Sequence, residues 1–158
     1  MSLKFILQNL EDLVASAFLI VTTSLVIINI IMRYILNSGL VWSEEVATGC
    51  FVWSVFIGAV AVFKHRGHVG VDLLVKRFPA ALQKVVRLLT DLILVVLNGY
   101  MAYLSVLYIQ TSYTKMTPVL GVSSAYISTS VLIAFVLMTV YAVKFVIGDL
   151  CGSKEVEK

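Results

Sequence analysis

The residues best suited to chemistry are few and lie near the ends of long apolar runs. His65 and His68 are three residues apart, a spacing at which two imidazoles could share a metal ion, and Asp72 is the available third ligand. Lys64 and Arg66 flank the pair and repel a cation, so we expect no metal site. No serine or cysteine has a base beside it, and the chain has no glycine-rich phosphate loop. We therefore expect no catalytic site, no cofactor and no enzymatic activity.

Asp91 is the acid closest to an apolar interior, where a carboxylate could carry a proton or a sodium ion across a membrane. It lies only about one helical turn inside the expected interface, and Arg87 precedes it by four residues. Because residues four apart meet on one face of a helix, we expect Arg87 and Asp91 to form a structural ion pair. A small transporter that works alone through Asp91 is the alternative.

Arg33, at the end of the first apolar run, has two possible roles. Its guanidinium could extend to lipid headgroups, or it could pair with Glu44 or Glu45, the acids nearest to it in the sequence. Ser43, followed by the two glutamates, predicts the start of a helix. Trp42 is placed as a residue of the interfacial aromatic belt, although its indole could also face a partner protein.

Four long apolar runs determine the fold class. Of the 158 residues, 60% are hydrophobic and 13% are charged, and a soluble domain of this size cannot bury that much apolar surface. Each run is long enough to cross about 30 Å of hydrocarbon as a helix. We predict an all-α integral membrane protein with four transmembrane helices, a single membrane domain over residues 1–158, and spans at about 13–34, 44–63, 89–112 and 123–145.

The basic residues predict the orientation of these spans. Ten of the twelve lysines and arginines fall on the side that holds both termini and the middle segment, whereas Arg33 and Lys115 fall on the other. The positive-inside rule therefore places both termini in the cytoplasm and the bend after Arg33 outside. The net charge of +3 then reflects topology and does not indicate a nucleic-acid partner. Cys50 and Cys151 fall on opposite sides, so we expect two unpaired thiols.

An amphipathic helix on the cytoplasmic membrane surface is expected at about residues 71–84, between the second and third spans. Apolar residues recur there at helical spacing, with charged residues around the rest of the helix. In the same region we expect His68 and Asp72 to hydrogen-bond locally and fix the loop. Basic side chains would reach phospholipid headgroups, each with an attraction of about 1 kcal/mol; these are Lys76, Arg77 and Lys84.

The second span carries small side chains on one face. Such a face allows another helix to approach closely. We expect helix packing, and no separate chemistry, at these positions, which are Ala47, Ser54, Gly58 and Ala61.

The chain resembles the small membrane subunit (DctQ type) of tripartite ATP-independent periplasmic (TRAP) transporters. The order and spacing of several short motifs carry the resemblance, and the four-span layout extends it over most of the chain. The motifs are Arg33, the Trp42-Ser43-Glu44-Glu45 bend, the Trp53 to Gly58 segment and the His68-Val69-Gly70-Val71-Asp72 loop.

The resemblance implies a bacterial inner-membrane complex in which a periplasmic binding protein delivers an organic acid to a large membrane subunit. In that family the large subunit holds substrate and sodium and works as an elevator, while the small subunit is a scaffold that helps to dock the binding protein. Family substrates include C4-dicarboxylates and sialic acids, and general likeness favours a sialic acid system. A purely structural assembly subunit is a further alternative. The implied partner-docking residues are Arg33, Trp42, Glu44 and Glu45.

Overall fold

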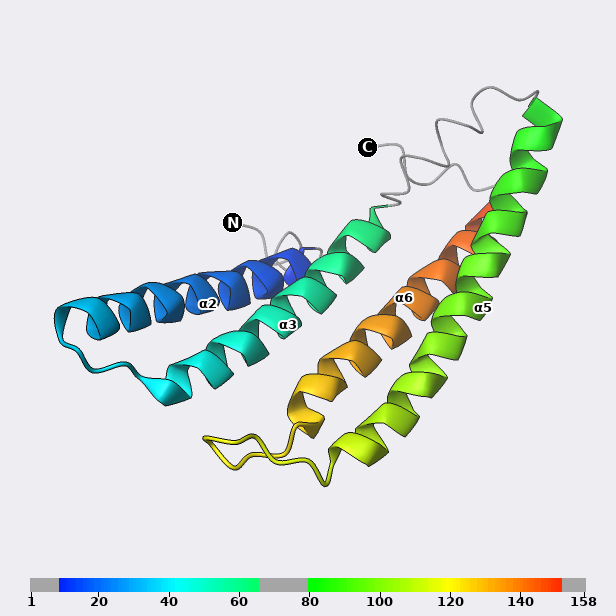
Figure 1. Cartoon of the computed structure of the whole chain (residues 1–158). Helices are drawn as coiled ribbons and strands as arrows, with labels where there is room; N and C mark the ends of the chain where they lie inside the picture. The colour runs from blue at the N-terminus through cyan, green and yellow to red at the C-terminus, as the bar shows by residue number, and fades with distance from the viewer. Residues whose placement is uncertain (1–8, 66–79, 152–158) are drawn as a thin grey trace.

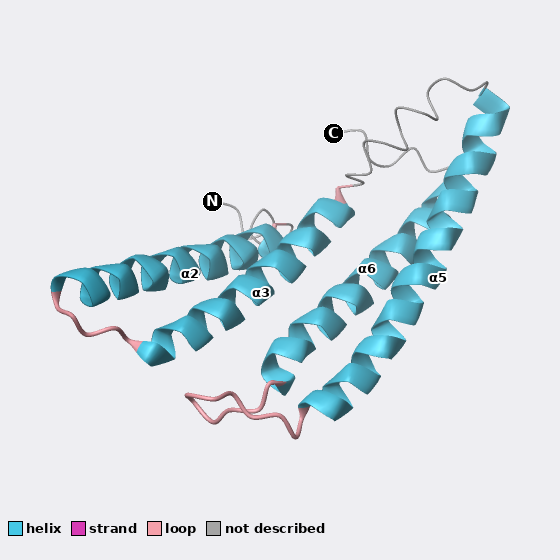
Figure 2. Ribbon diagram, viewed as in Figure 1, coloured by secondary structure: helices cyan, strands magenta, loops and turns pink. Residues whose placement is uncertain are grey.

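The computed structural model describes residues 9–65 and 80–151, which form four long helices (Figures 1 and 2). The prediction of an all-α membrane protein with four spans is confirmed, because each helix is long and apolar enough to cross a bilayer. The described residues contain no β-strand beyond one isolated bridge, between Met116 and Ser123. The helices are α2 (Leu10–Ile35), α3 (Val41–Lys64), α5 (Ala80–Ser112) and α6 (Ala125–Cys151).

The helices extend beyond the expected spans, most of all α5. This helix reaches back to Ala80, so residues 80–84, expected at the end of a surface helix, form its first turn. The remainder of that expected surface helix, residues 71–79, lies outside the described residues. In Figure 1 the first turns of α5 project past the ends of the other three helices.

The predicted start of the second helix at Ser43 is wrong. Leu40 is the N-cap residue of α3 and makes no side-chain capping bond, while Ser43 lies within the first turn. The Ser43 hydroxyl donates to the Leu40 carbonyl at 2.7 Å, and its side chain is 2% exposed. Asn29 of α2 accepts a hydrogen bond from the Leu40 amide at 2.9 Å, and this contact fixes the chain one turn earlier than a serine cap would.

The helices stand in the spatial order α2, α3, α6, α5. Contacts join α2 to α3, α3 to α6 and α6 to α5, so each outer helix packs against a single neighbour. Figure 1 shows two helical hairpins lying side by side through α3 and α6. The bend between α2 and α3 and the loop at residues 113–124 meet at one end of the molecule, which we call the loop end. The start of α2 meets the ends of α3 and α6 at the other end, which we call the inner end.

The core is thin and lies mainly on α3. Small side chains on this helix allow α2 and α6 to pack against its two sides. The outer helices expose most of their apolar side chains, which is stable in lipid and would be costly in water. Five of the eight buried apolar residues in the described chain belong to α3: Ala47, Ile57, Val60, Ala61 and Phe63.

Enlarging a core residue of α3 should therefore destabilise the fold. We expect Ala61→Leu to lower the free energy of unfolding by about 1–3 kcal/mol, because Ala61 is 3% exposed and a larger side chain must displace its neighbours. The next residue, Val62, is 62% exposed, so Val62→Leu is the matched control and should change stability by less than about 0.5 kcal/mol. Denaturation of the full chain in detergent micelles measures both. Equal losses in the two variants would contradict the central position of α3.

Candidate functional site

The first polar cluster closes the hairpin of α2 and α3 at the loop end. Arg33 Nη2 lies 2.5 Å from Glu44 Oε1, and both side chains are 58% exposed. The ion pair considered for Arg33 from the sequence is therefore present, and it is formed with Glu44. Asn29 is 8% exposed. Its Oδ1 accepts a hydrogen bond from the Leu40 amide, and its Nδ2 donates to Glu44 Oε1 at 3.4 Å. The cluster consequently fixes the bend that connects the two helices.

Glu45 connects the two helical hairpins at the same end. Its carboxylate accepts hydrogen bonds from the backbone amides of Val119 at 2.8 Å and Leu120 at 3.0 Å. These residues belong to the loop at 113–124, which folds back on itself through the Met116–Ser123 bridge and turns at Gly121 with a positive φ of 64°. The two adjacent glutamates thus have different tasks, since Glu44 closes one hairpin and Glu45 holds the loop of the other.

Aromatic contacts continue the junction into the membrane-spanning part. Trp53 of α3 donates from Nε1 to the Tyr126 carbonyl of α6 at 3.2 Å and stacks on Phe18 of α2 with ring centroids 5.8 Å apart. A Cβ atom at Gly49 would lie 2.9 Å from the Tyr126 hydroxyl, so this glycine lets the tyrosine pack closely on α3. Trp53 therefore joins three helices at one depth.

A second polar cluster, at the inner end, was not predicted from the sequence. Lys64 Nζ lies 2.8 Å from Glu11 Oε2, with side chains 21% and 14% exposed, respectively. The Tyr141 hydroxyl donates to the other Glu11 oxygen, and Lys64 also lies 5.9 Å from the Tyr141 ring centroid. These residues join α2, α3 and α6. Nearby, His65 Nε2 lies 3.8 Å from Asp12 Oδ2, and both side chains are at least half exposed.

A sequence signal for this second cluster existed but was weak. Glu11 stands at the start of one expected span and Lys64 at the end of the next, so an antiparallel hairpin brings them to the same depth. Tyr141 is 130 positions from Glu11, and no local pattern links the two.

Two of the four small residues of α3 meet the same residue of α2. The Ser54 hydroxyl donates to the Ala15 carbonyl at 2.9 Å. A Cβ atom at Gly58 would lie 3.8 Å from the Ala15 Cβ atom, an ordinary contact distance. The other two, Ala47 and Ala61, are 6% and 3% exposed. Ser54 and Gly58 therefore face α2.

Of the remaining predicted residues, some lie in the described helices and others lie outside the described ranges. Trp42 lies at the loop end and is 44% exposed. Arg87 and Asp91 lie one turn apart on α5, and the ion pair expected between them stays a prediction. Lys84 lies in the first turn of α5, and its side chain is not described. The remaining predicted residues fall outside the described ranges: His68, Asp72, Lys76 and Arg77.

The polar side chains at both ends mainly connect helices. Within residues 9–65 and 80–151, no group of three or more histidine, cysteine, aspartate or glutamate side chains gathers closely enough to hold a metal ion. The acids at both ends are instead bonded to basic side chains, to backbone amides or to a tyrosine. What these clusters achieve chemically is the joining of helices at the two membrane surfaces.

A family model and individual relatives point to the same protein family. The family model described as the DctQ component of tripartite ATP-independent periplasmic transporters matches residues 22–152. A Haemophilus influenzae protein named as a TRAP transporter small permease protein is 29% identical over 133 residues, covering 84% of this chain and 80% of that protein.

Two Vibrio cholerae proteins carry substrate names. The C4-dicarboxylate TRAP transporter small permease protein DctQ is 35% identical over 77 residues, which cover 49% of this chain and 33% of that protein. The sialic acid TRAP transporter small permease protein SiaQ is 23% identical over 136 residues, which cover 86% of this chain and 79% of that protein.

The inner-end cluster predicts strong coupling between Glu11 and Lys64. We expect Lys64→Met to lower the free energy of unfolding by about 3 kcal/mol, because it leaves the poorly exposed Glu11 carboxylate without its cation. The double variant Glu11→Gln with Lys64→Met should recover most of that loss, since neither charge then remains. A double-mutant cycle in detergent micelles measures the coupling. Additive effects of the two substitutions would show that the pair contributes little.

Proposed function

This chain belongs to the DctQ family of TRAP transporters and is a small permease subunit of the bacterial inner membrane, and we propose that it works there as the fixed scaffold of a larger permease subunit. In this proposal the larger subunit binds an organic acid and sodium ions and moves them. The scaffold keeps that subunit in place and offers part of the surface on which a periplasmic binding protein docks.

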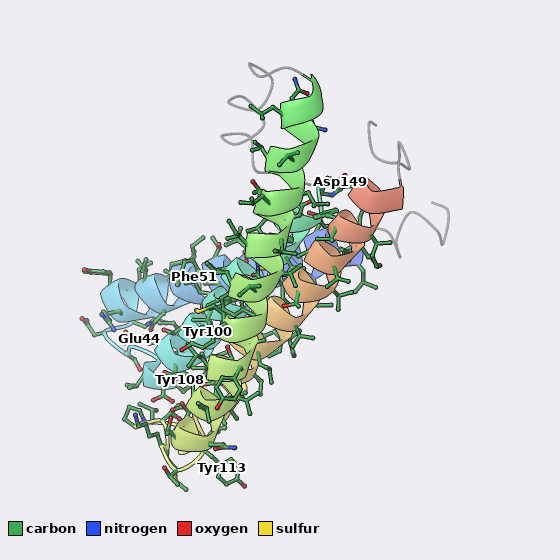
Figure 3. All side chains as sticks on the ribbon, turned by 90° about the vertical axis from the view of Figure 1, so that its right-hand side faces the viewer. Glu44, Phe51, Tyr100, Tyr108, Tyr113 and Asp149 are labelled. Carbon is green, nitrogen blue, oxygen red and sulfur yellow. The ribbon has the colours of Figure 1, made fainter. Side chains whose placement is uncertain are left out.

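The observation that carries the scaffold proposal is the one-sided packing of the outer helices. Apart from the Glu11–Tyr141 hydrogen bond at the inner end, α2 packs against α3 and α5 against α6, so both outer helices leave a long apolar flank exposed. Tyr100 and Tyr108 of α5, and Tyr113 directly after it, extend this flank toward the loop end, as Figure 3 shows. A second membrane protein can cover such flanks laterally while the ties at both ends keep the four helices together.

The orientation stays a proposal and follows from charge. Ten of the twelve lysines and arginines lie in the termini, in the segment between α3 and α5, or in the helix ends beside them, so the positive-inside rule places the inner end in the cytoplasm. The two connecting loops meet at the opposite end, as an even number of spans requires. In this orientation the loop end faces the periplasm. The amphipathic surface helix at 71–84, with Lys76, Arg77 and Lys84 on phospholipid headgroups, belongs to the same proposal.

We place the proposed docking surface at the loop end. The contacts of its residues indicate a separate role for each. Arg33 and Glu44 neutralise each other, so they offer a partner a paired and still half-exposed polar surface. Trp42 adds an exposed indole beside it. Glu45 acts indirectly, because it holds the loop at 113–124, whose exposed apolar side chains lie next to that surface. A binding protein would meet a preformed loop and lose little conformational entropy on docking.

The substrate is proposed as an organic acid of the C4-dicarboxylate or sialic acid class, taken up by sodium-driven symport. The names of the two Vibrio cholerae relatives support both classes. The relative named for C4-dicarboxylate has the higher sequence identity, but its match covers only about half of this chain. The relative named for sialic acid has a lower identity over most of this chain. The preference for sialic acid therefore gains no support.

Two other functions compete with the scaffold. An autonomous four-helix transporter would rely on Asp91, and a purely structural assembly subunit would make no contact with the binding protein. The exposed, preorganised loop end favours docking over assembly alone.

Reconstitution tests the scaffold proposal. Proteoliposomes that contain the larger subunit are supplied with the binding protein and a sodium gradient, with and without this chain. We expect substrate uptake only when this chain is present. Uptake by the larger subunit alone at the full rate would refute the scaffold role. Uptake by this chain alone, lost in Asp91→Asn, would establish the autonomous transporter instead.

Substitution of Glu45 tests the docking surface. We expect Glu45→Ala to weaken docking of the binding protein on the reconstituted complex severalfold. In this variant two backbone amides of the loop at 113–124 lose the carboxylate that accepts their hydrogen bonds. Amide hydrogen exchange at Val119 and Leu120 should rise in the same variant. Lys115→Gln, an exposed change in that loop which leaves both bonds intact, is the control. Faster exchange with unchanged docking would support the assembly-subunit alternative.

A further inference from the structure

A groove lies between α5 and α6. It is lined by Gly99 and Ala102 of α5 and by residues of α6 between 136 and 144. Its one polar side chain within the membrane, Thr139, donates its hydroxyl to the Phe135 carbonyl at 2.7 Å. The walls are therefore apolar until the inner end, where Lys144 lines the groove.

Gly99 indicates that the groove is left open by the chain itself. A Cβ atom at this position would meet nothing within 4 Å, so the glycine is not needed for packing of α5 against α6. Glycine in the middle of a helix costs about 1 kcal/mol relative to alanine. A larger side chain at position 99 would project into the groove.

The groove has room for a hydrocarbon chain. Its empty volume is about 660 Å³. A single acyl chain is only about 5 Å wide, since its carbons contact their neighbours at about 4 Å, so a length of about 12 Å occupies only about 240 Å³.

Lys144 supplies the matching charge at the end of the groove. Its side chain is exposed, and its ammonium lies 5.4 Å from the Tyr141 ring centroid, beside the inner-end cluster. The three ion pairs found among the described residues do not include Lys144. A phospholipid carries its phosphate at the membrane surface and its acyl chain toward the centre, the same order in which Lys144 and Gly99 occur along the groove.

We propose that this groove is a phospholipid site, in which one acyl chain lies against Gly99 and the lipid phosphate contacts the Lys144 ammonium. The proposal goes beyond the scaffold function and does not depend on it, because the site is made entirely of this chain. The lipid belongs to the leaflet at the inner end of the molecule.

The test measures phospholipid held by the full chain, purified in a mild non-ionic detergent with the subunits that remain bound. Vesicles of phosphatidylethanolamine with a photoreactive acyl chain serve as the probe, and crosslinked positions are mapped by mass spectrometry. In the wild type we expect crosslinks at Gly99 and Ala102. Gly99→Leu, or independently Ala102→Leu, should fill the groove and abolish them. Lys144→Gln should reduce them about fivefold, the size of one lysine's attraction to a lipid phosphate.

Gly148→Leu is the matched control. A side chain added at Gly148 also enters open space on α6, but this residue does not line the groove, so the crosslinks should persist. Equal crosslinking in the wild type and in both groove-filling variants would overturn the proposal. Lipid crosslinks at Gly99 and Ala102 that appear only after the other subunits have been removed would overturn it as well, because a helix of another subunit would then be what covers the groove.

Discussion

The contact between α3 and α6 is the interaction on which the rest of the structure depends. By backbone packing α2 lies against α3 and α5 against α6, so the two hairpins meet mainly along this seam, with one further tie at the inner end between Glu11 of α2 and Tyr141 of α6. The seam is held at every depth, by Glu45 on the loop amides, by Trp53 on the Tyr126 carbonyl, and by Phe63 stacked on Phe145 near the inner end. In lipid no hydrophobic effect drives helices together, so these specific contacts must supply the association.

The sequence was sufficient for the fold class because its dominant signal is one of length and hydropathy. A run of about 20 apolar residues has a single stable form in a bilayer, and four such runs define four helices. It was also sufficient to name the Arg33–Glu44 pair as one of two possibilities, since both residues flank the same short bend. The helix start at Ser43 failed because burial of that side chain between helices overrode its capping preference.

Contacts between distant segments could not be predicted in the same way. Glu45 accepts hydrogen bonds from backbone amides. Every residue except proline has such an amide, so the sequence does not show which residues will donate to Glu45. Glu11 and Tyr141 meet only because α2 and α6 both approach the end of α3. Such contacts depend on the order of helices in space, and hydropathy alone does not specify that order. The sequence could therefore predict contacts between neighbours at the bend, such as Arg33 with Glu44, but not contacts between α3 and α6.

The ion pairs and the apolar flanks place different demands on a partner subunit. The acids and bases at the two ends bond largely within this chain, so a partner that approaches α2 or α5 meets surfaces that are mostly apolar. Lipid is as apolar as these flanks, and a partner gains little from burial alone. Recognition across them must therefore depend on shape and on the few polar atoms available, such as the hydroxyls of the exposed Tyr100, Tyr103 and Tyr108. The proposed scaffold role requires a chain that keeps its own shape, and the contacts along the α3–α6 seam and at the inner end hold the four helices together.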